Sequence, residues 1–286
     1  MEHPYQDRFW NSADGLRLHY RDYPGREDRP PLLCLHGLTR NSRDFAGLAE
    51  RYAGEWRVIA PDMRGRGDSD HAKDSSTYAL PNYLADLELL FESEGIGRFV
   101  AIGTSMGGLL TMLLAATNRD RIVAALLNDV GPEVETGGIE HIRSYLGQQR
   151  SFPTWIHAAR AIEEVQRASF PDNTIEDWLA AAKRSMVLGQ NGRITFDYDM
   201  AIAEPFNASG SEPVPDLWPA FEALAGRPLV LVRGEISRLL SAGIAAEMQR
   251  RVPDMEVAIV PRVGHAPTLS EPPAIAALDR MLARIA

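Results

Sequence analysis

Residues 99–116 constrain the fold of this chain more than any other segment. Phe99-Val100-Ala101-Ile102 is a short continuous apolar run, as in a strand buried on both faces, and residues 109–116 predict a helix. Between them stands Gly103-Thr104-Ser105-Met106-Gly107. A G-x-S-x-G sequence between a strand and a helix is typical of a sharp turn, whose glycines avoid collisions with the neighbouring strand and helix. The segment therefore predicts a sheet covered by helices, with the Ser105 hydroxyl held out above the strand end.

The pattern of a buried strand followed by a turn or a helix recurs along the chain. Residues 9–23 alternate apolar and polar side chains around Asp14-Gly15, which indicates a hairpin. Residues 78–94 have helical spacing of apolar residues, and a final amphipathic helix begins near Pro272. Strands that alternate with helices favour an α/β fold, with a mainly parallel sheet and helices on both faces. The further predicted strands are residues 31–35, 56–60, 123–127, 228–234 and 256–260.

The pattern changes between residues 133 and 215. Helical stretches dominate there and aromatic residues are frequent, whereas the strand pattern resumes only at residues 228–234. Residues 207–215 are rich in Ser, Gly and Pro, which favours a loop. We therefore predict an α/β core formed by residues 1–132 and 216–286. A helical insertion, residues 133–215, follows the sixth strand.

Charge and apolar content limit the partners of this chain. The net charge is −9, and an acidic protein repels nucleic-acid backbones and anionic membrane surfaces. No apolar run approaches the ~20 residues of a membrane-spanning helix, and residues 1–7 lack the features of a secretion signal. The single cysteine, Cys34, lies in an apolar strand and predicts a buried thiol. We expect a cytoplasmic protein whose partner is a small-molecule substrate, and the sequence leaves the oligomeric state open.

Ser105 needs a base, because a serine hydroxyl is a poor nucleophile until a neighbouring group takes its proton. In folds with this strand–turn–helix unit, the base is a histidine that follows the acid and lies near the C-terminus. His265 stands in the loop after the last predicted strand and meets this requirement, whereas the other histidines do not. The negative oxygen that develops on a substrate also needs hydrogen-bond donors. The backbone N–H groups of Leu38 and Met106 have the expected positions.

A resemblance to a known family rests on four segments, which are His36-Gly37, residues 62–69, residues 103–108 and Val263-Gly264-His265. In this order they resemble the landmarks of a capped serine hydrolase of the α/β-hydrolase superfamily. The resemblance covers nearly the whole chain. It implies an eight-stranded sheet, a helical cap over the active site (here residues 133–215), and neither a cofactor nor a metal. Arg66-Gly67-Asp68 lies within the second segment, and we interpret it as structural rather than as a cell-adhesion motif.

The chain departs from this family at the acid that orients the histidine. Similar proteins carry Gly-x-x-Ser-Asp after the seventh strand, where this chain has Gly234-Glu235-Ile236-Ser237-Arg238. Arginine stands in the acid position, and a guanidinium cannot accept a hydrogen bond from imidazole. Asp129, which comes one helix and one strand after Ser105, is the favoured replacement. Glu235 is the alternative acid, and a site without any acid also stays open.

These residues predict hydrolysis of a carboxylic ester or lactone through an acyl-serine intermediate. Ser105, His265 and Asp129 are the expected catalytic groups, and the aromatic residues of the insertion favour an apolar or aryl ester. Hydrolysis of a carbon–carbon bond in a diketone-type substrate, which some similar capped hydrolases perform with the same triad, is one alternative. A non-catalytic ligand-binding protein is the other, because Arg238 occupies the usual acid position.

Overall fold

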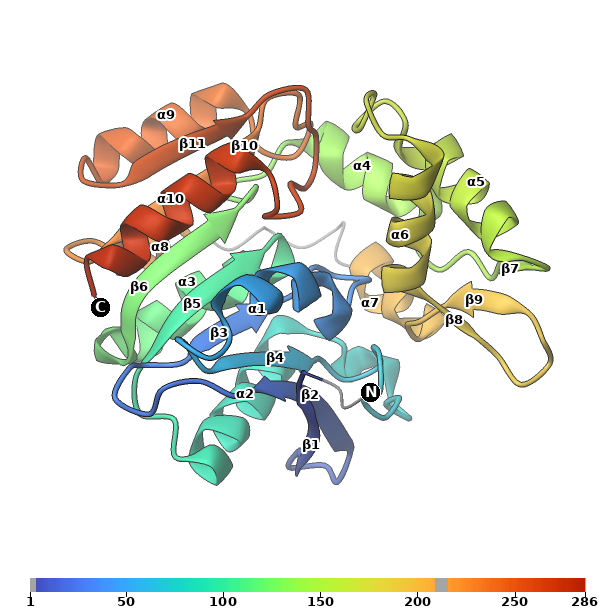
Figure 1. Ribbon diagram of the computed structural model, residues 1–286, viewed down its shortest axis with the longest axis horizontal. Coiled ribbons are helices and arrows are strands. Elements are labelled where there is room, and N and C mark those ends of the chain that lie inside the picture. Colours follow the sequence, from blue (N-terminus) through green and yellow to red (C-terminus); the bar gives the residue numbers. More distant parts are fainter. Residues whose placement is uncertain (1–3, 209–215, 286) are drawn as a thin grey trace.

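The computed structural model describes residues 4–208 and 216–285, and its main sheet has eight strands. These are β1 (Gln6–Asn11), β2 (Arg17–Tyr23), β3 (Leu32–Leu35), β4 (Val58–Asp62), β5 (Phe99–Thr104), β6 (Ile122–Asn128), β10 (Leu229–Gly234) and β11 (Glu256–Val260). Their order across the sheet is β1-β2-β4-β3-β5-β6-β10-β11 (Figure 1). Neighbouring strands run parallel except in the pairs β1–β2 and β2–β4. The predicted α/β fold class is confirmed.

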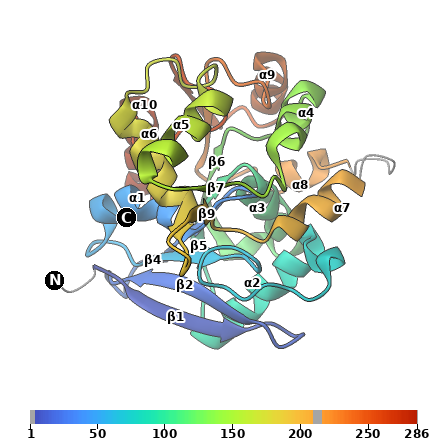
Figure 2. The ribbon, with the colours of Figure 1, turned by 90° about the vertical axis from the view of Figure 1, so that its right-hand side faces the viewer.

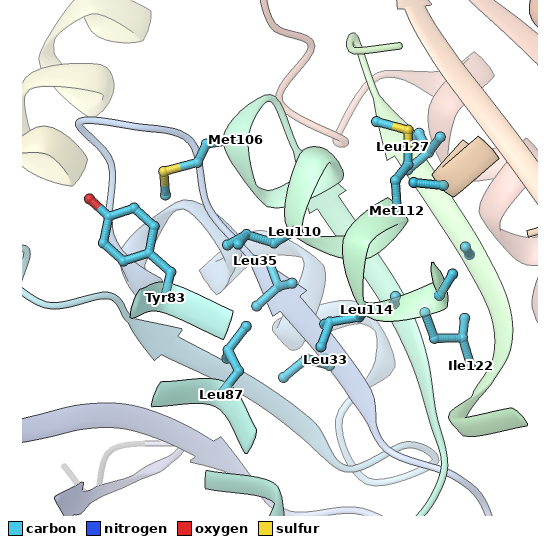
Figure 3. Packing of buried hydrophobic residues seen from close by; sticks show 14 of the residues in the cluster. Leu33, Leu35, Tyr83, Leu87, Met106, Leu110, Met112, Leu114, Ile122 and Leu127 are labelled. Atoms are coloured by element: carbon cyan, nitrogen blue, oxygen red, sulfur yellow. The ribbon is translucent and has the colours of Figure 1, made fainter. Parts of the chain in front are cut away.

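Two apolar clusters lie on opposite faces of this sheet, because successive side chains of a strand point to opposite faces. Helices α1 (Ala46–Tyr52) and α10 (Pro272–Ala283) cover one face, and α2 (Leu80–Glu94), α3 (Met106–Thr117), α8 (Trp218–Glu222) and α9 (Ala242–Arg251) cover the other. Leu33 and Leu35 of β3 pack with Leu110 and Leu114 of α3 (Figure 3). Cys34, between the two leucines, faces the α1 side and is fully buried, as the sequence predicts.

The segment between β6 and β10 folds into helices and a second, smaller sheet. In chain order it contains α4 (Thr136–Tyr145), β7 (Ser151–Phe152), α5 (Trp155–Gln166), α6 (Ile175–Ser185), β8 (Met186–Leu188), β9 (Ile194–Phe196) and α7 (Ala203–Ala208). The antiparallel sheet β7-β9-β8 was not predicted, because strands of two and three residues are too short to show a period. Of the predicted loop 207–215, residues 207 and 208 end α7 and the remainder lies outside the described residues. We call residues 133–208 the inserted segment.

Polar contacts connect the inserted segment to the core, and the chain also contains four short 3-10 helices within the described residues. The 3-10 helices are η1 (Ser42–Phe45), η2 (Ser75–Thr77), η3 (Arg119–Arg121) and η4 (Met200–Ile202). Arg43 of η1 donates from Nη2 to Asp197 Oδ2 at 2.5 Å and from Nε to the Arg184 carbonyl oxygen at 3.0 Å. Figure 2 shows the inserted elements in front of the sheet, on the side toward which the parallel strands point in Figure 1. Across the ranges that the structure describes, no helix is long and apolar enough to span a membrane.

Candidate active site

Ser105 occupies the turn between β5 and α3. Its backbone has φ 53° and ψ −116°, a conformation that is costly for a residue with a side chain. A Cβ at Gly103 would lie 2.4 Å from the Gly107 carbonyl oxygen, and a Cβ at Gly107 would lie 2.0 Å from the Leu35 carbonyl oxygen. The close packing of α3 on β5 and β3 therefore requires glycine at both positions, and this packing holds the strained turn in place.

Ser105, His265 and Asp129 form one continuous chain of hydrogen bonds. His265 Nε2 lies 3.0 Å from Ser105 Oγ, and His265 Nδ1 lies 2.9 Å from Asp129 Oδ2. Because a carboxylate oxygen accepts, Nδ1 carries a proton and Nε2 is left to accept the proton of the serine hydroxyl. This arrangement can raise the nucleophilicity of Ser105.

The sheet register explains why Asp129 reaches the imidazole. Thr104 of β5 pairs with Asn128 of β6, so Ser105 and Asp129 leave neighbouring parallel strands at the same level. Asn128 also fixes the loop that carries His265, since its Nδ2 donates to the Pro267 carbonyl oxygen at 2.8 Å. Asn128 is a site residue that the sequence pattern did not predict, and its position at the strand end beside Asp129 was the only signal for it.

The loop after β10 binds Asp129 instead of supplying an acid of its own. The Asp129 side chain is fully buried, its Oδ1 accepts from the Gly234 N–H at 2.9 Å, and its Oδ2 accepts from Ser237 Oγ at 2.6 Å. Glu235 is exposed, and its carboxylate accepts from the Arg262 N–H at 2.8 Å. The side chain of Arg238 is exposed and makes no hydrogen bond to any residue that the structure describes. The structure thus brings Asp129, and not Glu235, to His265.

The backbone N–H groups of Leu38 and Met106 are free to bind a substrate oxygen, since no hydrogen bond within residues 4–208 and 216–285 uses them. Arg66 holds the next peptide of this loop, because its Nε donates to the Leu38 carbonyl oxygen at 2.9 Å. Arg66 is fully buried, and its Nη1 donates to Tyr83 Oη at 2.9 Å. Arg66, which we interpreted as structural, therefore positions the loop that carries Leu38.

His36 connects the same loop to the turn after β4. Its Nδ1 donates to the Gly37 carbonyl oxygen at 2.7 Å, and its Nε2 accepts from the Met63 N–H at 3.1 Å. These partners require a neutral imidazole with its proton on Nδ1. Burial of the fully enclosed ring lowers the pKa of His36 to about 4, which keeps it neutral near pH 7.

A cavity of about 510 Å³ opens above Ser105 and His265, between the core and the inserted segment. This volume is that of a small-molecule site. Both the Leu38 loop and the inserted segment line it. Residues 133–215 contain eight Phe, Trp and Tyr residues, and four of them line the cavity. The four are Tyr145, Phe170, Trp178 and Phe196.

One group of side chains has the spacing of metal ligands, namely Asp7, His19 and Asp68 at the β1–β2 edge. Both ring nitrogens of His19 already face carboxylates, with Nδ1 2.7 Å from Asp62 Oδ2 and Nε2 2.9 Å from Asp7 Oδ1. Burial lowers the pKa of His19, but the hydrogen bond and charge of Asp62 outweigh it and raise the pKa overall. The carboxylates around the ring thus favour the protonated form of His19, which fits a structural role for this cluster.

Known proteins with similar sequences and structures identify the family to which this chain belongs. A model of the alpha/beta hydrolase family matches residues 32–278, which include β3 to β11 and most of α10. The chain belongs to the α/β-hydrolase family. Within this family, a crystal structure of an alpha/beta hydrolase from Novosphingobium aromaticivorans is 61% identical, covers 100% of both chains and superposes with a TM-score of 0.96.

Two curated relatives of this α/β hydrolase have named activities. A 3-hydroxybutyrate-oligomer hydrolase from Cupriavidus necator is 37% identical over 273 residues, which are 93% of this chain and 92% of the relative. A 2-(acetamidomethylene)succinate hydrolase from Mesorhizobium japonicum is 27% identical over 236 residues, 82% of this chain and 81% of the relative. Each match extends over both the core and the inserted segment.

Proposed function

We propose that this α/β hydrolase cleaves carboxylic esters through an acyl-serine intermediate, with Ser105 as the nucleophile. The observation that carries the proposal is the unbroken hydrogen-bond chain from Ser105 Oγ through the imidazole of His265 to the buried carboxylate of Asp129. A serine, a histidine and an acid with these contacts form the arrangement that activates a serine hydroxyl for acyl transfer.

The geometry supports the following sequence of steps. His265 Nε2 accepts the hydroxyl proton as Ser105 Oγ bonds to the ester carbonyl carbon, and Asp129 stabilises the imidazolium that forms. The N–H groups of Leu38 and Met106 donate to the negative oxygen. The bond to the alcohol then breaks, and the imidazolium gives its proton to the leaving oxygen. A water that loses its proton to His265 then attacks the acyl-serine. The bond between the acyl carbon and Ser105 Oγ breaks, His265 returns the proton to Ser105 Oγ, and the acid is released.

The substrate that fits best is a short aliphatic hydroxy-acid ester. The relative from Cupriavidus necator is named for oligomers of 3-hydroxybutyrate, in which ester bonds join the hydroxyl of one unit to the carboxyl of the next. The cavity is lined by arginines and carboxylates as well as aromatic rings, which favours a polar substrate over the apolar or aryl ester suggested by the sequence. We further propose that residues 133–215 act as the cap that encloses this substrate.

No contact in the site specifically favours carbon–carbon bond hydrolysis. Arg238 suggested a non-catalytic binding protein, because it stands in the usual acid position. Asp129 contacts the imidazole from another strand, which supports catalysis over binding alone. Ester hydrolysis is therefore the function we propose.

Reaction with a fluorophosphonate probe, followed by intact mass, tests the proposal. We expect rapid addition of a single probe molecule to the wild type and none to Ser105→Ala. The same pair of proteins is then given the ester dimer of 3-hydroxybutyrate, and we expect 3-hydroxybutyrate release by the wild type only. A folded wild type that neither reacts with the probe nor cleaves the dimer would falsify the proposal.

A further inference from the structure

Two arginines and one aspartate form a cluster on the wall of the active-site cavity. Arg40 lies in the Leu38 loop, Asp44 lies in η1, and Arg184 lies in α6 of the inserted segment, and all three line the same cavity as Ser105. Arg40 lies close to the nucleophile, because a Cβ at Gly37 would lie 3.4 Å from Arg40 Cγ and 3.6 Å from Ser105 Cβ.

The hydrogen-bonding capacity of this cluster is not filled. Arg40 donates from Nε and Nη2 to the two carboxylate oxygens of Asp44, at 2.7 and 2.5 Å, and its Nη1 has no partner among the described residues. The Arg184 side chain makes no hydrogen bond to any part of the chain that the structure describes. Its Nε is 3.8 Å from Asp44 Oδ1, beyond hydrogen-bond length. Two guanidinium groups thus share one carboxylate.

The remaining carboxylates around the cavity accept hydrogen bonds from neighbouring residues and not from Arg184. Asp177 accepts from the N–H and hydroxyl of Thr174 at the start of α6, and Glu271 Oε1 accepts from the Thr268 N–H at 2.8 Å. Glu271 Oε2 is buried without a hydrogen bond, and no salt bridge joins it to Arg184 within the described ranges. Burial lowers the pKa of Arg184, as does the charge of Arg40, and the carboxylates of Asp44, Asp177 and Glu271 offset these effects only in part. No carboxylate of the described residues lies within hydrogen-bond distance of the Arg184 guanidinium.

We propose that Arg184, together with Nη1 of Arg40, binds a free carboxylate on the ester substrate. This inference rests on the proposed function and names its substrate class, a hydroxy-acid ester with a carboxylate at one end. Planar guanidinium groups match a carboxylate in shape and charge.

The position of the carboxylate determines which bond is cleaved. In a linear hydroxy-acid oligomer, the free carboxylate belongs to the alcohol side of the last ester bond. A carboxylate held at Arg184 places that last bond next to Ser105. The enzyme then removes one hydroxy acid at a time from the carboxyl end, and the released unit is the alcohol product of the first step.

A matched pair of substrates and a matched pair of variants test this inference. The substrates are the 3-hydroxybutyrate dimer and the same dimer with its terminal carboxylate converted to a primary amide, which removes the charge and retains the ester. The variants are Arg184→Met and Arg167→Met. Arg167 is an exposed arginine of the inserted segment that pairs with Glu163 and does not line the cavity. Product release from both dimers gives kcat and KM.

For the wild type we expect kcat/KM to be at least about tenfold higher for the acid than for the amide. In Arg184→Met, kcat/KM for the acid should fall about 10- to 100-fold, mainly through KM, because the variant loses a charge-assisted hydrogen bond to the substrate carboxylate. For the amidated dimer, kcat/KM of Arg184→Met should stay within about threefold of the wild-type value. Arg167→Met should resemble the wild type with both substrates. The wild type should also cleave the ester bond of the amidated dimer, and Ser105→Ala should not. This comparison tests the proposed function separately.

Three results would overturn the inference. The first is a wild type that cleaves acid and amide equally well. The second is an Arg184→Met variant that loses both activities to the same extent, which indicates a structural role for the arginine. The third is a wild type that cleaves neither dimer, which also removes the proposed substrate class. The first two results leave ester hydrolysis by Ser105 intact.

Discussion

Asp129 is a buried carboxylate surrounded by three hydrogen-bond donors. The Gly234 N–H, the Ser237 hydroxyl and the His265 Nδ1–H all reach its two oxygens. These donors fix the plane of the carboxylate, so that Oδ2 faces the imidazole. Its function, if it is the triad acid, is to hold His265 in the tautomer that accepts from Ser105.

We expect Asp129→Asn to reduce kcat by about 10³- to 10⁴-fold, because an amide can stabilise the wrong imidazole tautomer, and the equivalent change in a serine protease costs about 10⁴-fold. Steady-state hydrolysis of the hydroxybutyrate dimer and the rate of fluorophosphonate labelling are the measurements. Glu235→Gln is the control. It should leave the rates of hydrolysis and of labelling within about twofold of the wild-type values, since Glu235 accepts from the Arg262 N–H and not from His265. A large loss in Glu235→Gln with an active Asp129→Asn would contradict this assignment.

His36 predicts a dependence of stability on pH. Burial lowers its pKa from 6.5 to about 4, so between these values the unfolded chain binds a proton here that the folded chain does not. The free energy of unfolding therefore decreases as pH falls from 6.5 toward 4, by up to about 1.4 kcal/mol per pH unit. His36→Gln lacks this titration. Urea unfolding at pH 7 and pH 5 should show the stability advantage of the wild type over the variant shrinking by about 2 kcal/mol, and a constant difference would refute the prediction.

At the scale of elements, the two turns after β3 and β4 act as one unit. Arg66 from the second turn holds the Leu38 carbonyl oxygen, and His36 from the first binds the Met63 N–H of the second. Asp62 adds a further connection, because its Oδ1 accepts from the Ser42 N–H at 2.6 Å. The direction of the Leu38 N–H therefore depends on side chains about 30 residues away in the sequence.

We expect Arg66→Met to lower kcat for ester hydrolysis by about 10- to 100-fold with a smaller change in KM. A misdirected Leu38 N–H would weaken one of two oxyanion donors, and complete loss of such a donor costs about 10²- to 10³-fold. Arg64→Met is the matched control: Arg64 lies in the same turn but pairs with Asp86 at 2.7 Å. That variant should lose stability but retain its kcat in the folded fraction. Equal kcat values for both variants would argue against a positioning role for Arg66.

At the scale of the whole molecule, part of the inserted segment has a core of its own. Phe152, Ala158 and Trp178 belong to an apolar cluster separate from the two that line the main sheet, whereas Tyr198 and Ile202 join the main core. Polar contacts such as Arg43–Asp197 connect the separate cluster to the rest of the chain. We therefore expect helices α5 and α6 to be able to open without exposing the main core.

Hydrogen exchange monitored by mass spectrometry tests this division. We expect the amides of α5 and α6 to exchange through a local opening with a lower free energy than the amides of β5 and β6, which require global unfolding. A carboxylate substrate mimic that contacts both Arg40 and Arg184 should slow exchange in α6. Identical protection in the helices and in the central strands would show that the chain opens as one unit.

The sequence predicted the fold well because period and turn chemistry are local properties. The strand that begins at Phe99 and the turn around Ser105 can be predicted from neighbouring residues alone. The order of serine, acid and histidine along the chain indicated His265. The acid was different, because the choice between Asp129 and Glu235 depends on the register of β5, β6 and β10, which no local pattern encodes. The role of Arg66 and the small sheet β7-β9-β8 depend on tertiary contacts in the same way.

The register at the strand ends also bears on how such enzymes diverge. Val232 of β10 pairs with Asn128 of β6, so the ends of both strands lie close to the same imidazole. The position of the carboxylate that faces the histidine can therefore differ between chains that share this sheet. In this chain Arg238 follows β10, and Asp129 contacts the imidazole from the end of β6. A family survey that looks for an acid only after β10 would overlook such a carboxylate.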